Sequence, residues 1–371
     1  MGFKKGLYLL WPDFDYIDKC VKSGIDHLLI ANQNTESKAD EIHPHWGQYK
    51  ESLCLMNILE EYYIKHKPDL EMIFLPIWVC FYMDLPKEQQ FYDGEKYITR
   101  TPCPTSLDWI NSRLEACKYM IDKSPHGMTK DIMFDPEHYA HSSMPDKLLD
   151  LWEDRNNPKH ICKCPRCKEM KLDNIFQWVY HNIKVKEKLD SLGLHSKGQL
   201  QCENAWNYYK YHEHWYYTER TYPVRDVMQK WWKLKIEYPF GFIKDIALAK
   251  KNKIDMKISA GVWVERFKVD DLLDYIKWIG KNPIFDGYWF YPQNRFSKYS
   301  WIKQYNEQEK EKYGDLFTGL IDDPNVENSD PQFFEKLKKV HKYIDDYRDS
   351  WEFKLKKYIL KGLISAAKLV V

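Results

Sequence analysis

Several common sequence features are missing from this chain, and each absence excludes a class of protein. No apolar run reaches the roughly 18–20 residues that a membrane-spanning helix needs. There is no GxGxxG fingerprint and no Walker-type loop, so we expect no nucleotide cofactor. The N-terminal sequence MGFKKGLYLLWPDF has no small-residue cleavage site after its short apolar run. We therefore expect a cytoplasmic protein without a transmembrane segment.

An excess of charge of one sign is also lacking. The 371 residues include 56 basic and 55 acidic side chains. Proteins dedicated to nucleic acids usually carry a strong basic excess, so we expect no nucleic-acid partner. The nine cysteines form no disulfide framework, because three fall together in residues 162–167 and the other six are scattered. This usage fits a reducing compartment and one metal cluster.

Aromatic residues, in contrast, are abundant. They make up 16% of the chain, with 15 Trp and 27 Tyr. Tyr and Trp present flat apolar faces with a polar atom, which suits sugar rings and nucleobases, although any single aromatic residue is more often part of a core. The densest run is WNYYKYHEHWYYTERTY at 206–222. It can be interpreted as a wall of a sugar cleft, a stacking surface for nucleic acid, or a loop packed on the fold; the balanced charge favours the first and third.

Short apolar runs alternate with helical patterns along the chain. Seven runs are typical of strands, at residues 6–11, 27–31, 72–80, 131–134, 199–206, 257–264 and 285–291. Helical patterns occupy 15–23, 52–66, 106–123, 173–192, 223–251 and 269–279. This alternation predicts an α/β protein with a (β/α)8 TIM-type barrel. The eighth strand is expected near 238–242, or else the barrel is irregular.

The predicted domain organisation follows from this pattern. A barrel spans residues 1–330 and contains a cysteine-rich insert at 140–172. A C-terminal helical extension of one or two helices covers 331–371, with Asp330 and Pro331 as its start signal.

Carboxylates follow the predicted strands at the end where a barrel holds its active site. Asp135 and Glu137 lie two residues apart after the fourth strand, so they share one face if the chain stays extended. Their mutual repulsion would make one of them hold its proton, which is how a general acid is made at neutral pH. Glycoside hydrolysis needs such an acid and a second carboxylate, for which Glu265 and Glu203 are candidates. Any single carboxylate at a strand end more often caps a helix or forms a salt bridge.

Aromatic side chains occupy the same predicted strand ends. Stacking against sugar rings would suit them, and a carbohydrate is the expected substrate. The candidate sugar-binding residues are Tyr139, Trp206, Trp263, Trp289, Tyr291 and Trp11.

The stretch DPEHY at 135–139, followed by CKCPRC at 162–167, resembles a family of glycoside-hydrolase-like barrel proteins. In that family a strand-four Asp-x-Glu-x-Tyr precedes a Cys-x-Cys-x-x-Cys insert. The Asp-x-Glu pair also resembles the end of the chitinase-like signature, which implies Glu137 as the acid and Asp135 as a group that assists a substrate acetamide; the earlier aspartates of that signature are replaced by Lys130 and Met133.

A second resemblance is to the large clan of retaining glycosidases with the acid on strand four and the nucleophile on strand seven. If GVWVE at 261–265 ends strand seven, this implies Glu137 as acid/base, Glu265 as nucleophile and Trp289 beneath the sugar. The clan usually has Asn just before its acid, and Pro136 stands there in this chain.

The segment HICKCPRC places His160, Cys162, Cys164 and Cys167 together. Three thiols at this spacing predict a structural zinc site, with His160 as the fourth ligand and His181 or Cys202 as alternatives. The competing interpretation is three reduced cysteines without a metal. The spacing also resembles the zinc site of the tRNA-guanine transglycosylases, which have a histidine further along the chain.

We therefore predict a glycoside hydrolase-like enzyme that cleaves or transfers a glycosidic bond. One alternative is a non-catalytic carbohydrate-binding or structural barrel. The other, less favoured by the charge balance, is a zinc-containing nucleic-acid-modifying barrel of the transglycosylase type.

Overall fold

The computed structural model describes most of the chain. The described residues are 2–10, 13–31, 50–75, 85–134, 162–172, 174–194, 196–201, 213–217, 243, 246–247, 250, 257–291, 293–298 and 319–369.

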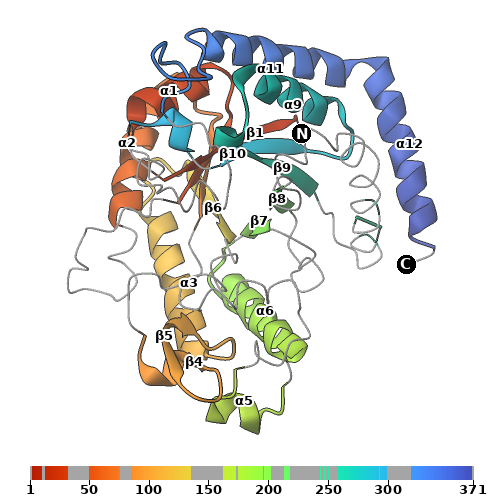
Figure 1. The fold of residues 1–371 in the computed structure, drawn as a ribbon. Helices are drawn as coiled ribbons and strands as arrows, with labels where there is room; N and C mark the ends of the chain where they lie inside the picture. The colour runs from red at the N-terminus through yellow and green to blue at the C-terminus, as the bar shows by residue number, and fades with distance from the viewer. Residues whose placement is uncertain are drawn as a thin grey trace.

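Within these residues, eight parallel strands close into a barrel (Figure 1). In chain order they are β1 (Lys4–Leu9), β2 (His27–Ile30), β3 (Glu71–Phe74), β6 (Thr129–Phe134), β7 (Ser196–Gln201), β8 (Glu213–Tyr217), β9 (Lys257–Trp263) and β10 (Gly287–Tyr291). Each strand pairs with its neighbour in chain order, and β1 pairs with β10 to close the ring. The predicted (β/α)8 fold is confirmed.

The strand missing from the sequence prediction is β8. It lies between β7 and β9, inside the aromatic run that we interpreted as a cleft wall, a stacking surface or a loop. The expectation of an eighth strand near 238–242 was wrong, because β8 already fills the gap between β7 and β9; residues 238–242 themselves lie outside the described part.

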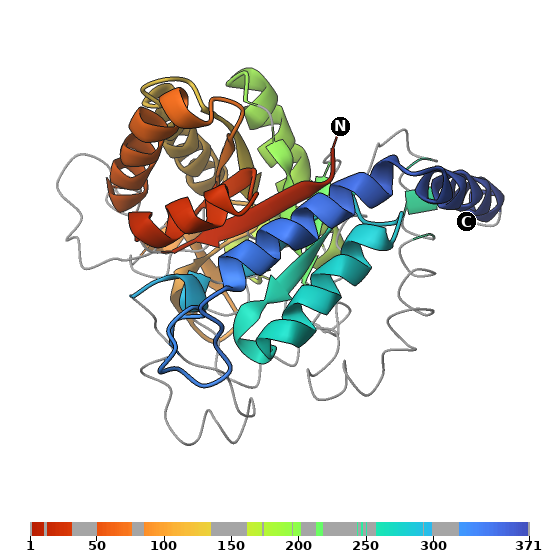
Figure 2. The same ribbon diagram turned by 90° about the horizontal axis from the view of Figure 1, so that it is seen from above.

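Helices cover the outside of the barrel (Figures 1 and 2). They are α1 (Phe14–Lys22), α2 (Lys50–His66), α3 (Leu107–Asp122), α6 (Asn174–Ser191), α9 (Val269–Lys281) and α11 (Phe333–Asp349). Each matches a helical pattern predicted from the sequence, because its apolar residues recur on one face. Ser106 precedes α3 as expected, but its side chain makes no capping hydrogen bond.

The apolar core has an inner and an outer part. Inside the barrel, Tyr8, Leu29, Ile73, Met133 and Trp289 form one buried cluster with their neighbours. The alternate residues of the same strands point outward and pack against the helices, as strand geometry requires. The barrel interior is therefore filled by side chains, and the ends of its strands are the places left for a site.

Two helices end the chain, and they differ in how they pack. Helix α11 lies between α1 and α9 in Figure 2, and Phe333, Leu337 and Ile344 are buried in the outer core. Helix α12 (Trp351–Ala367) turns away from α11 and extends along the side of the molecule (Figure 1). The domain boundary predicted at residue 330 stays a prediction, since α11 packs on the barrel. No helix in the described ranges has the length and apolarity to cross a bilayer.

A small unit outside the barrel was not predicted. An antiparallel hairpin of β4 (Gln90–Tyr92) and β5 (Tyr97–Pro102) follows the 3-10 turn η2 (Lys87–Gln89) in the connection from β3 to α3. Asp93 stabilises the hairpin turn by accepting hydrogen bonds from the backbone N–H groups of Glu95 and Lys96. The short helix α5 (Pro165–Glu169) lies against it, in the connection from β6 to α6.

Candidate active site and metal centre

The order of the barrel strands fixes where the candidate carboxylates stand. Strand β6 is the fourth barrel strand and ends at Phe134, so Asp135 is the next residue. Strand β9 is the seventh, and Glu265 follows its last residue, Trp263, by two positions. Asp135, Glu137, Tyr139, Glu203, Trp206 and Trp11 lie outside the described residues, so their predicted roles stay predictions. Glu265 is described.

Glu265 sits in the 3-10 turn η6 (Val264–Arg266) at the carboxyl end of β9 and is fully buried. Among the described residues, Arg295, in the turn η7 (Gln293–Phe296) after β10, interacts electrostatically with Glu265. Burial lowers the pKa of Arg295 to about 10, and the negative charge of Glu265 opposes this shift. The carboxylate is thus held in a site of low dielectric with a cation nearby, where a charge interaction is stronger than in water.

Arg295 is fixed by the loop that follows. Its Nη2 donates to the carbonyl oxygen of Asn328 at 3.0 Å, and its Nε donates to that of Gly319 at 3.4 Å. Its side chain is fully buried. The segment 319–328 therefore holds the guanidinium in place beside Glu265.

Asp13 ties the end of the first barrel strand to the segment after the eighth. It is 6% exposed, and its Oδ2 accepts from the backbone N–H of Lys298 at 2.7 Å and from Ser297 Oγ at 3.4 Å. This carboxylate has a structural task, which is the commoner role for an acid at a strand end.

The described aromatic candidates lie on neighbouring strands. Trp289 is fully buried inside the barrel, with its ring centroid 6.0 Å from that of Tyr8. Positions 263 and 291 are register partners on β9 and β10, two residues beyond the pair Gly261 and Trp289 along the strands. The roles of Trp263, Trp289 and Tyr291 in sugar binding stay predictions, and Trp289 belongs to the barrel core.

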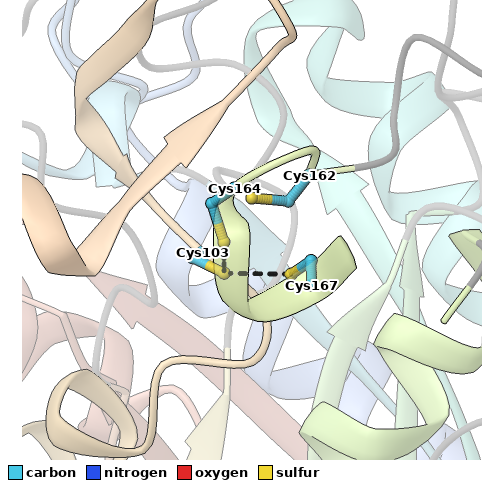
Figure 3. Close-up of side chains that lie close together, drawn as sticks. All are labelled: Cys103, Cys162, Cys164 and Cys167. Atoms are coloured by element: carbon cyan, nitrogen blue, oxygen red, sulfur yellow. Dashed lines mark hydrogen bonds between the residues drawn. The ribbon is translucent and has the colours of Figure 1, made fainter. Parts of the chain in front are cut away.

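Four cysteines meet between the hairpin and α5 (Figure 3). Cys103 directly follows β5, whereas Cys162, Cys164 and Cys167 come from the turn and helix of α5. The Sγ atom of Cys103 lies 3.7 Å from that of Cys164 and 3.4 Å from that of Cys167. All four sulfur atoms lie within 4.8 Å of one another, and all four residues are buried. This group can hold a metal ion.

Helix α6 holds both halves of the cysteine group. The buried side chain of Gln177 makes two hydrogen bonds to the backbone of Cys162. Its Oε1 accepts from the N–H group at 3.0 Å, and its Nε2 donates to the carbonyl oxygen at 2.9 Å. His181 Nδ1 lies 2.9 Å from the carbonyl oxygen of Pro104, next to Cys103, and burial lowers its pKa to about 4. His181 was an alternative metal ligand in the sequence prediction. It instead binds the backbone beside the group.

The thiols strongly influence one another's ionisation. Hydrogen bonding with Cys103 and burial raise the pKa of Cys162, and the same contact with Cys103 raises that of Cys167. Hydrogen bonding with Cys103 lowers the pKa of Cys164. Four negative thiolates cannot share this volume without a cation, and a bound metal ion would allow all of them to ionise.

The fourth member, Cys103, was missed from the sequence. His160, the predicted fourth ligand, lies outside the described residues, and so does Cys202. The signal that we missed is the Asp93–Gly94 pair, which is typical of a hairpin turn. It precedes the stretch YITRTP at 97–102, and Cys103 follows that stretch directly. The thiol also precedes the other three in the chain, whereas the transglycosylase-like pattern has a histidine after them.

Comparisons with known proteins agree with the barrel. The sequence matches no protein-family model and no curated protein. One similar solved structure is a GH5_18 protein from Bifidobacterium longum subsp. infantis, with a TM-score of 0.50 and 9% identity over 94% of this chain and 80% of that one. Another is the tryptophan synthase alpha chain from Legionella pneumophila subsp. pneumophila, with a TM-score of 0.38 and 12% identity over 94% of each chain. At 9% identity the likeness to the GH5_18 structure shows the fold alone.

Proposed function

We propose that this protein is a glycoside hydrolase-like enzyme that cleaves or transfers a glycosidic bond. The observation that carries the proposal is the position of Glu265, a buried carboxylate at the end of the seventh barrel strand, while DPEHY directly follows the fourth. Carboxylates at these two strand ends match the arrangement of the retaining clan that the sequence resembles. The GH5_18 neighbour supports a barrel of this kind.

In this proposal Glu137 is the general acid/base and Glu265 the nucleophile. Glu137 protonates the leaving oxygen while a Glu265 oxygen attacks the anomeric carbon, and Glu137 then takes a proton from the water that releases the sugar. Asp135 tunes the pKa of Glu137 or orients the substrate. Arg295 balances the negative charge of Glu265 before the attack, and Glu265 becomes a neutral ester when the bond to the sugar forms. Glu203 is the second carboxylate if Glu265 is not.

The sugar would lie over the carboxyl ends of the strands. Tyr139, Trp206 and Trp11 follow the fourth, fifth and first barrel strands, and Trp263 and Tyr291 end the seventh and eighth. Stacking on such rings would orient the substrate. Trp289 is part of the buried cluster inside the barrel.

We also propose that the four cysteines bind a structural zinc ion. Zinc–sulfur bonds of about 2.3 Å in a tetrahedron place the sulfur atoms about 3.8 Å apart, close to the 3.7 Å between Cys103 and Cys164. Four protein ligands leave no open position for catalysis. The hairpin and α5 need such a link, because Phe91 and Ile98 are the other buried apolar residues in their described core.

One observation favours the alternative of a non-catalytic carbohydrate-binding or structural barrel. Glu265 is fully buried, and a buried carboxylate facing Arg295 can serve as a structural ion pair. In that case the strand-end carboxylates would contribute to binding or stability, with no bond cleaved.

Hydrolysis of aryl glycosides tests the proposed function. A panel covering the common pyranosides, in both anomers, is incubated with the wild type and with Glu137→Gln. We expect turnover of at least one glycoside by the wild type and a loss of roughly 10²–10⁴-fold in the variant. A panel that is bound but not cleaved would favour the carbohydrate-binding alternative, and equal turnover by both proteins would exclude Glu137 as the acid.

A further inference from the structure

Helix α12 carries apolar side chains on two opposite faces. One face packs on the protein, where Phe353 and Ile364 are buried and Leu360 and Ala367 are partly buried. The other face is open to solvent. Its exposed apolar residues are Trp351 (76% exposed), Leu355 (48%), Tyr358 (76%), Ile359 (53%) and Leu363 (48%).

These exposed residues form one continuous surface. Trp351, Leu355, Tyr358 and Ile359 follow the spacing of a single helix face. In Figure 1, α12 lies along the side of the molecule. Its start is fixed by Ser350 Oγ, which accepts from the backbone N–H of Phe353 at 3.3 Å. An exposed apolar surface of this kind marks an interaction site.

The charges of α12 are almost all positive. Residues 351–369 contain five lysines and one glutamate. Lys354, Lys357, Lys361 and Lys368 recur at helical spacing along one flank of the apolar face, and all are exposed. Lys356 pairs with the single glutamate, Glu352, at 2.8 Å. Among the described carboxylates, none forms an ion pair with the four lysines of the flank.

This combination of charge and apolar surface selects one kind of partner. A second copy of the chain would bring the same lysines together, and they would repel. An anionic bilayer offers both an apolar layer and negative headgroups, and Trp and Tyr favour the boundary between them. No described helix can cross a bilayer, so α12 would lie in the plane of the surface.

We propose that α12 is a membrane-surface helix that attaches the protein to anionic lipid bilayers. Its inner face stays on the protein, while Trp351, Leu355, Tyr358 and Ile359 enter the headgroup boundary. The lysine flank binds lipid headgroups. This inference does not depend on the proposed glycosidase activity, and it adds a location for whatever reaction the barrel performs.

Vesicle flotation with the full chain tests the proposal. Unilamellar vesicles of phosphatidylcholine alone are compared with vesicles of phosphatidylcholine and phosphatidylserine at about 7:3. We expect the protein to float with the mixed vesicles and to remain in solution with phosphatidylcholine alone. Raising the salt concentration should release it, since the lysines are at the surface.

Two pairs of variants separate the apolar from the electrostatic contribution. Ile359→Ser should weaken binding about tenfold, whereas Ile58→Ser, on α2 and equally exposed at 52%, should not change it. The double variant Lys354→Gln/Lys361→Gln should weaken vesicle binding about fivefold for each lysine removed. The matched double variant Lys65→Gln/Lys339→Gln, on α2 and α11, should leave vesicle binding unchanged. Circular dichroism checks that each variant is folded.

Three results would overturn the proposal. They are no flotation with either kind of vesicle, equal loss of binding in Ile58→Ser and Ile359→Ser, and concentration-dependent dimers in analytical ultracentrifugation that Ile359→Ser abolishes. The last result would assign the face of α12 to a second copy of the chain.

Discussion

At the residue scale, two buried glutamates differ in their surroundings. Glu60, on α2, accepts five hydrogen bonds, from the hydroxyl groups of Ser124 and Thr129 and from the backbone N–H groups of His126, Met128 and Thr129. It supports the loop that enters β6, at the amino end of that strand. Glu265 lies at the carboxyl end of β9 beside Arg295. The surroundings predict a structural role for Glu60 and a catalytic role for Glu265.

This difference predicts opposite effects for the same substitution. On a glycoside that the wild type cleaves, Glu265→Gln should lower kcat/KM by at least about a thousandfold, because the nucleophile is removed. Glu60→Gln should change kcat/KM little and lower Tm, because hydrogen-bond acceptors are replaced in a buried site. Steady-state kinetics and thermal unfolding of both variants give the comparison. A drop in activity for both variants in proportion to their loss of Tm would contradict the catalytic role.

A second prediction at this scale concerns Cys103. If the four thiols bind zinc, Cys103→Ser should reduce zinc bound to the purified protein from about one ion per chain to a small fraction. Cys54→Ser, which changes an exposed cysteine outside the group, should keep the full amount. Elemental analysis by mass spectrometry measures both. A zinc content unaffected by Cys103→Ser would mean that the fourth ligand lies elsewhere.

At the element scale, α9 and α11 pack so closely that a glycine is required between them. A Cβ atom on Gly280 would lie 2.5 Å from Ile344 Cγ1, and Ile344 is fully buried. We expect Gly280→Ala to lower the free energy of unfolding by about 1–3 kcal/mol through overpacking. Gly362→Ala, on α12 with no atom within 4 Å of the added Cβ, should raise it by up to about 1 kcal/mol through helix propensity. Denaturant unfolding tests the pair, and equal effects would contradict the close packing.

The elements also show what the sequence could and could not predict. The seven strands and the main helices were predictable because their apolar residues follow periods of two or of about 3.6. Strand β8, EHWYY, was missed because parallel barrel strands are usually rich in Val, Ile and Leu, whereas this one has aromatic and charged residues. The Cys-x-Cys-x-x-Cys trio was visible as a local motif. Its fourth member was not, because only the folded hairpin brings Cys103 to it.

At the scale of the whole molecule, a buried histidine couples α11 to the barrel. The Nδ1–H of His341 donates to the carbonyl oxygen of Ser23 at 2.7 Å, and Nε2 accepts from the Tyr288 hydroxyl at 2.5 Å. Burial, followed by the charge of Lys5, lowers the pKa of His341 to about 3; Asp26 opposes the shift and Lys67 adds to it. The neutral ring is therefore part of the folded state.

This histidine predicts how stability depends on pH. Below about pH 6.5 the unfolded chain binds a proton at His341 that the folded protein does not, so the free energy of unfolding falls as the pH falls toward 3. The loss from this group is at most about 1.4 kcal/mol per pH unit. His341→Gln should show a shallower dependence between pH 6 and pH 4 in urea unfolding experiments, whatever its stability at pH 7. An unchanged slope would contradict a neutral buried His341.

In the proposed mechanism, Glu265 is the nucleophile at the end of the seventh barrel strand. The most direct measurement is covalent trapping with a panel of 2-deoxy-2-fluoro glycosyl fluorides, followed by peptide mass spectrometry. We predict a glycosyl label on the peptide that contains Glu265, and its loss in Glu265→Gln but not in Glu60→Gln. A label on Glu203 would move the nucleophile to the fifth strand. Turnover of a glycoside with no label on any carboxylate would contradict the nucleophilic mechanism.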